Sequence, residues 1–147
     1  MSMLKSLKVR LMDIIPYYSI QDDNQKDEDT RLTVIFSTKK LLKHFSKSDV
    51  VHLDATYRLN WQGFPVMIIG VSSSTGKFYG CLTVLSSHED TEAWNEIYKF
   101  IHSMDIHPKI RMSDGATSIT KSGNEIFGTC EHCKDSSRLM CWSHACA

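Results

Sequence analysis

Two aspartates follow apolar runs and lie sixty residues apart, at positions 54 and 114. Asp54 belongs to the stretch 50–57, where apolar and polar residues alternate with the period of a β-strand. Asp114 ends a second short run, and Gly115 behind it allows a sharp exit. Carboxylate oxygens at two strand ends are ligands that Mg²⁺ and Mn²⁺ prefer. The pattern predicts a divalent-metal site for phosphodiester chemistry; ordinary strand-to-turn junctions have the same residue types, and that alternative stays open.

The apolar, β-branched character of the first run predicts a central strand. We therefore expect Asp54 to lie near buried backbone rather than at a free surface. A buried carboxylate without a partner is costly, so a cation, a metal or hydrogen-bond donors should lie beside it.

A second set of chemically capable residues gathers near the C-terminus. Cys130 and Cys133 are separated by two residues, as are Cys141 and His144. Tetrahedral zinc favours such pairs because one turn can direct both ligands inward. The four residues predict a zinc site. In the alternative reading, Cys141 packs against a sheet and His144 donates to a neighbour or contacts DNA.

Composition describes one soluble globular domain. The 147 residues are 41% hydrophobic and 23% charged, and 17 basic side chains balance 17 acidic ones. The overall charge therefore gives no support for a polyanionic partner, although a local basic face remains compatible with it. No apolar run approaches the roughly 18 residues of a membrane span, and no secretory signal is recognisable. Five cysteines without a disulfide-like spacing favour an intracellular protein.

The first thirty-one residues read differently from the rest. A short helix is expected before Pro16, and the acidic, polar stretch 21–31 is typical of a linker or surface loop. We therefore separate an N-terminal segment, 1–31, from a domain over 32–147. In that domain the patterns predict strands at 32–36, 50–59, 65–71, 78–85, 109–113 and 138–142, and helices ending near 46, 104 and 127.

The second of these helices has the clearest pattern. Ser87 or Asp90 is its expected N-cap, and its apolar positions recur with helical spacing. Three antiparallel strands followed by parallel crossover strands predict an α/β fold, a mixed sheet with helices on its faces. If the strand before Asp114 lies beside the strand of Asp54, both carboxylates meet at one sheet edge. That is a ribonuclease-H-like arrangement, here incomplete at its C-terminus.

Three motifs in order carry a family resemblance: HLDATY at 52–57, SDGA at 113–116 and CWSH at 141–144. With Phe64-Pro65 and with Ser86, Glu89 and Asp90 before the long helix, they resemble the catalytic core of Mutator-like element (MULE) transposases. The resemblance covers about residues 32–144. It implies a ribonuclease-H-like fold in which two aspartates and one glutamate hold two divalent metals for DNA cleavage and strand transfer.

Residue by residue, the resemblance makes Asp54 and Asp114 the first two catalytic, metal-binding acids and Cys141 with His144 the Cys-x-x-His pair of the family. It implies Mg²⁺ or Mn²⁺ as cofactor, transposon-end DNA as partner, homo-oligomers and a nuclear location.

The third acid of the family is not found at its expected place. It lies well beyond the Cys-x-x-His motif, and none of the glutamates here, Glu89 included, occupies a matching position. We therefore expect a fragment or a truncated relic without efficient strand transfer. Two alternatives stay open: a domesticated, non-catalytic domain that binds DNA or protein, and a small zinc-binding module.

Overall fold

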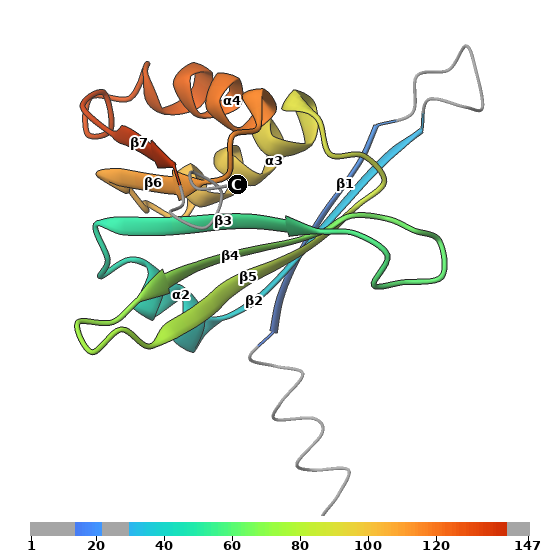
Figure 1. Cartoon of the computed structure of the whole chain (residues 1–147), viewed down its shortest axis with the longest axis horizontal. Helices are drawn as coiled ribbons and strands as arrows, with labels where there is room; N and C mark the ends of the chain where they lie inside the picture. The colour runs from blue at the N-terminus through green and yellow to red at the C-terminus, as the bar shows by residue number, and fades with distance from the viewer. Residues whose placement is uncertain (1–13, 22–29, 141–147) are drawn as a thin grey trace, which may run out of the picture.

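A computed structural model describes residues 14–21 and 30–140 (Figure 1). In these residues the chain is an α/β protein with a seven-stranded mixed sheet and three helices. The strands are β1 (Ile14–Gln21), β2 (Arg31–Thr38), β3 (Val50–Thr56), β4 (Val66–Ser72), β5 (Phe78–Ser86), β6 (Ile110–Ser113) and β7 (Ser137–Met140). The helices are α2 (Lys39–Phe45), α3 (Thr91–Ser103) and α4 (Thr117–Phe127). Cys141 and His144 lie outside the described residues.

The strands lie in the order β1-β2-β5-β4-β3-β6-β7. β3, β4 and β5 form the expected antiparallel meander, and β6 lies parallel beside β3. β7 lies parallel beside β6. Parallel neighbours need crossover connections, which α3 and α4 provide. The predicted mixed sheet is therefore confirmed. β6 also lies next to β3, which is the condition under which the two aspartates were expected to meet.

The sheet contains one strand that the sequence did not predict. β1 pairs antiparallel with β2 along its length, with Tyr17 opposite Ile35. The helix expected before Pro16 falls mainly on residues 1–13, outside the described part, and Ile14–Gln21 is extended. Pro16 is tolerated because β1 is an edge strand, where a missing backbone N–H costs little. Part of the segment set apart as 1–31 thus belongs to the sheet.

The buried side chains project from one face of the sheet. Along β3, Val51 and Leu53 are buried and alternate with His52 and Asp54, which face the other way. All three described helices pack on the face of Leu53 and contribute to one core. The sequence predicted a sheet with helices on its faces that is incomplete at its C-terminus, and in the described residues the helices cover one face.

The strongest sequence pattern is confirmed in α3. Trp94, Ile97, Tyr98 and Ile101 are all buried, and Asp90, one of the two predicted N-caps, accepts the hydrogen bond that begins the helix. α3 and α4 lie side by side (Figure 1).

Candidate metal-binding site at the sheet edge

Three strands that run in the same direction each end near an acidic residue. β4 is antiparallel to both β3 and β5, so β3 and β5 point the same way, and β6 is parallel to β3. Their C-terminal ends therefore share one edge of the sheet. Asp54 lies near the end of β3, Glu89 follows β5, and Asp114 follows β6.

The two predicted aspartates are brought together by strand register. β3 and β6 pair His52 with Met112, so Asp54 and Asp114 each lie two residues beyond this last pair, at the same end of the two strands. Neighbouring strands lie about 4.8 Å apart. Asp114 is half-buried, and its Oδ1 accepts a hydrogen bond of 3.0 Å from the backbone N–H of Ala116.

The expected burial of Asp54 was wrong. Its strand is central, as predicted, yet the side chain is exposed. The reason is the one-sided packing of the sheet: Asp54 points to the face that no described helix covers. Among the described residues, none donates a hydrogen bond to its carboxylate.

Glu89 is the functional candidate that the sequence reasoning missed. The hydroxyl of Tyr57, just after β3, donates to Glu89 Oε2. Burial raises the pKa of Glu89, and the negative charges of Asp114 and, less strongly, Asp54 raise it further. The nearby indole N–H of Trp94 lowers the pKa of Glu89 and so opposes this rise. The contact does not meet the geometry of a hydrogen bond. A third carboxylate thus lies within electrostatic reach of both aspartates.

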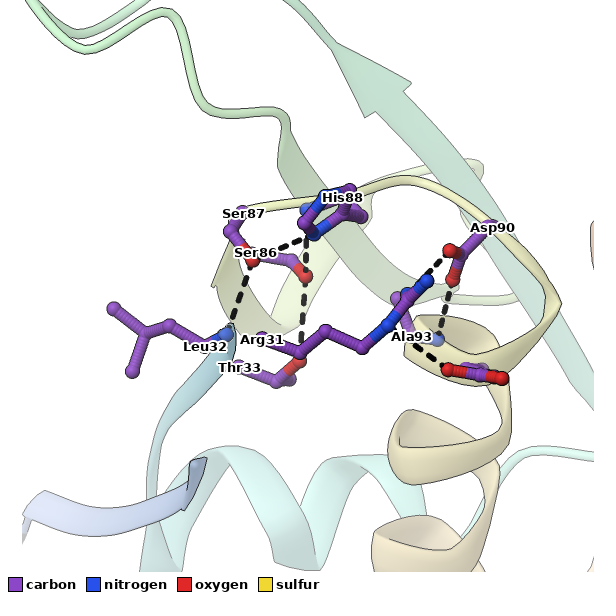
Figure 2. Close-up of polar contacts among 9 residues, drawn as sticks. Arg31, Leu32, Thr33, Ser86, Ser87, His88, Asp90 and Ala93 are labelled. Carbon is purple, nitrogen blue, oxygen red and sulfur yellow. Dashed lines mark hydrogen bonds and ion pairs between the residues drawn. The ribbon is translucent and has the colours of Figure 1, made fainter. Parts of the chain in front are cut away.

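The connection that carries Glu89 is held to β2 (Figure 2). The Ser87 hydroxyl accepts a 3.0 Å hydrogen bond from the backbone N–H of Leu32, and the hydroxyls of Thr33 and Ser86 lie 3.2 Å apart. Thr33 and Ser86 are both buried, so this pair is shielded from water. The backbone before Glu89 is therefore fixed by the sheet itself.

The backbone after Glu89 is fixed by the start of α3. Asp90 caps the helix by accepting a 3.0 Å hydrogen bond from the backbone N–H of Ala93 (Figure 2). Its other oxygen pairs with the Arg31 guanidinium, whose Nε lies 3.0 Å from Glu92. Glu89 thus lies between two anchored positions, which limits the range of its side chain.

A cation lies beside the backbone of Asp114. Arg138 on β7 donates to the backbone oxygen of Asp114, and its Nε lies 3.3 Å from the Ser113 hydroxyl. Arg138 pairs with the buried Arg111 across β6 and β7, so its side chain leaves the sheet on the face that the helices cover.

The signal that could have identified Glu89 was in the predicted topology. In a three-stranded meander the third strand runs in the direction of the first, so its exit lies at the edge that carries Asp54. The family pattern places the third acid beyond the Cys-x-x-His motif, so Glu89 was not among the predicted site residues.

A separate His/Cys group that could hold a metal ion lies in the described residues. The ligand atoms of His102, His107 and Cys130 are all within 4.8 Å of one another. His107 Nδ1 lies 3.1 Å from Cys133 Sγ and 3.8 Å from Cys130 Sγ. Burial, together with the neighbouring Cys130, raises the pKa of Cys133 to about 12. Of the predicted zinc ligands, Cys130 and Cys133 are thus brought together, whereas Cys141 and His144 fall outside the described part.

Comparison with known proteins gives no further identification. No protein-family model matches the chain, and no curated protein matches it. No helix in the described residues is long and apolar enough to cross a membrane.

Proposed function

We propose that the chain is a ribonuclease-H-like, MULE-type DNA-cleaving domain whose carboxylates Asp54, Glu89 and Asp114 bind Mg²⁺ or Mn²⁺. One observation carries the proposal: three strands of common direction bring these acids to a single sheet edge. Glu89 takes the place of the acid that the family supplies further along the chain.

The residues present fit hard divalent cations. All three donors are carboxylates, the ligand type that Mg²⁺ and Mn²⁺ favour. Asp54 is exposed, and no described residue donates a hydrogen bond to it. Burial is the largest cause of the raised pKa of Glu89, and the negative charges of the two aspartates raise this pKa further. A bound cation would relieve the repulsion among the three carboxylates. Bound metal would supply activation of the attacking oxygen and neutralisation of phosphate charge.

The remaining residues of the edge would position the carboxylates and the substrate. Tyr57 orients Glu89 through its hydroxyl, and Arg138 donates to the backbone oxygen of Asp114. The loop that leaves β3 at the same edge carries Trp61, which is 98% exposed. An exposed aromatic ring can stack on a nucleic acid base. The sheet face on which Asp54 lies is free of described helices and leaves room for a DNA strand.

The test is Mn²⁺-dependent nicking of supercoiled DNA by the full chain. We expect Asp54→Asn and Asp114→Asn each to lower the rate of nicking by at least about 100-fold. This is more than the roughly 10–100-fold loss that is usual when a residue only hydrogen-bonds to a metal ligand. Glu89→Gln should lower the rate of nicking as well. Asp49→Asn is the matched control, because Asp49 is exposed and pairs with Lys109 away from the three carboxylates.

A thermal-unfolding measurement separates cleavage from binding. Mn²⁺ should raise the melting temperature of the wild type and of Asp49→Asn but not of Asp54→Asn. Nicking that survives in both aspartate variants would contradict the proposal. Metal stabilisation without any nicking would instead indicate a non-catalytic descendant of the transposase fold.

A further inference from the structure

Four potential zinc ligands converge from two connections of the chain. His102 lies in the last turn of α3, and His107 lies between α3 and β6. Cys130 and Cys133 lie between α4 and β7. Packing of α3 against α4 brings these connections together, although the two pairs are more than twenty residues apart in the sequence.

The distances from His107 to the two sulfurs approach those of a tetrahedral zinc site. Zinc bonds of about 2.0–2.3 Å place neighbouring ligand atoms about 3.3–3.8 Å apart. His107 Nδ1 lies 3.1 Å from one sulfur and 3.8 Å from the other. The nearest ligand atoms of His102, His107 and Cys130 stay within 4.8 Å of one another. Coordination by all four residues would require His102, whose side chain is exposed, to move toward Cys133.

A carboxylate already orients one of the imidazoles. His107 Nε2 lies 2.8 Å from Asp105 Oδ1, so the ring can donate its Nε2–H to Asp105 and direct a bare Nδ1 toward the sulfurs. Metal-binding histidines commonly have such a carboxylate partner, which fixes the tautomer and raises the basicity of the ligand.

The cysteine pair is arranged by a tight turn. The backbone N–H groups of Cys133 and Lys134 both donate to the carbonyl of Cys130, at 3.0 and 2.8 Å. Cys133 is buried, whereas Cys130 and His102 line an open groove. The groove gives an ion access to the ligands without unfolding the chain.

We propose that His102, His107, Cys130 and Cys133 bind one structural Zn²⁺. Thiolate and imidazole donors suit zinc rather than Mg²⁺ or Mn²⁺, and two thiolates balance its charge. Four protein ligands leave no open position, which is typical of a structural site. The site differs from the ligand set predicted from the sequence because the two histidines replace Cys141 and His144.

The zinc would fix the connection that leads to β7. It joins the end of α3 to the residues just before the strand that carries Arg138. Since His107 precedes β6 and Asp114 follows it, the zinc lies at the opposite end of that strand from the carboxylates. The inference is therefore independent of the proposed nuclease site.

The experiment is a Co²⁺ titration of the metal-free, reduced full chain, followed by competition with Zn²⁺. Co²⁺ bound by thiolates gives a charge-transfer absorption that reports sulfur ligation directly. We expect one Co²⁺ per chain, displaced by one Zn²⁺. His102→Gln, His107→Gln, Cys130→Ser and Cys133→Ser should each weaken binding by at least tenfold, and His44→Gln, an exposed histidine elsewhere, should not.

Asp105→Asn keeps all four ligands and should weaken binding by about 10–100-fold. This variant keeps the proposal testable even where loss of the buried Cys133 prevents folding. No thiolate-to-cobalt absorption in the folded wild type would overturn the proposal. The proposal would also be overturned if His102→Gln and His107→Gln bound Co²⁺ fully while Cys141→Ser and His144→Gln lost Co²⁺ binding.

Discussion

Asp90 both caps α3 and carries a charge that the fold stabilises. Burial alone would raise the pKa of Asp90, but the hydrogen bond from Ala93 and the Arg31 guanidinium outweigh it, so the pKa lies below its ordinary value of 3.8. A depressed pKa means that the ionised form is favoured in the folded state. Its contribution to stability is therefore complete above the unfolded-state pKa and is lost as the pH falls through the folded-state value.

We predict that Asp90→Asn lowers the free energy of unfolding at pH 7 by up to about 1 kcal/mol, because the ion pair is partly exposed and screened. Asn remains a good N-cap, so Asp90→Ala should cost about 1 kcal/mol more. Urea unfolding from pH 7 to about pH 3 checks this. The difference between wild type and Asp90→Asn should persist down to about pH 4 and then shrink as the pH falls through the folded-state pKa, which lies below 3.8. A difference that stays constant with pH would refute the electrostatic account.

The positions of single site residues in the fold could be predicted from the sequence only where the local sequence pattern determined them. Strand-end positions identified Asp54 and Asp114, and strand pairing placed them at the same end of two neighbouring strands. The exposure of Asp54 was not predictable because it depends on which sheet face the helices cover. His102 and His107 were passed over for a similar reason, since only the packing of α3 on α4 brings them to Cys130 and Cys133.

At the scale of elements, α4 must accommodate a buried cation from β6. Arg111 is 4% exposed, lies over the Phe127 ring and donates to Asn124 and to the carbonyl of Ser136. A Cβ atom on Gly123 would lie only 1.5 Å from Arg111 Nη1. Glycine is unfavourable inside a helix, and at position 123 the missing side chain leaves space for the guanidinium.

We predict that Gly123→Ala destabilises the protein by about 1–3 kcal/mol, since overpacking against a buried, hydrogen-bonded guanidinium outweighs the gain of about 1 kcal/mol in helix propensity. Ser122→Ala in the same helix is the matched control. The Ser122 hydroxyl is buried without a hydrogen-bond partner among the described residues, so its removal should be neutral or stabilising. Urea unfolding of both variants measures this, and a stabilised Gly123→Ala would contradict the packing argument.

The elements with a one-sided pattern were the predictable ones. In α3 the apolar residues recur at helical spacing and all are buried, so periodicity identified the helix. β1 lacked the corresponding signal. Its Tyr18 and Ile20 are apolar yet 72% and 61% exposed, so apolar residues occupy both faces and no alternation remains. Pro16 then favoured a break over a strand.

At the scale of the whole molecule, the two proposed metal sites lie at opposite ends of β6. That strand spans about 10 Å, and the zinc ligand His107 and the acid Asp114 lie beyond its two ends. Sites further apart than about 7–10 Å that share no partners contribute nearly additively to stability. Besides β6 itself, β7 connects them, because it follows the cysteine turn and carries Arg138, which donates to the backbone oxygen of Asp114.

This arrangement gives a prediction about coupling. If the sites are independent, zinc removal should lower the free energy of unfolding by the same amount in wild type and in Asp54→Asn, within about 0.5 kcal/mol. The gain from Mn²⁺ should likewise be equal in wild type and in Cys130→Ser. If β7 couples the two sites, removal of zinc should instead reduce the stabilisation that Mn²⁺ gives. In Arg138→Gln the stabilisation by Mn²⁺ should then no longer depend on zinc. Urea unfolding of these variants with and without each metal distinguishes the two outcomes, because only coupling through β7 requires Arg138.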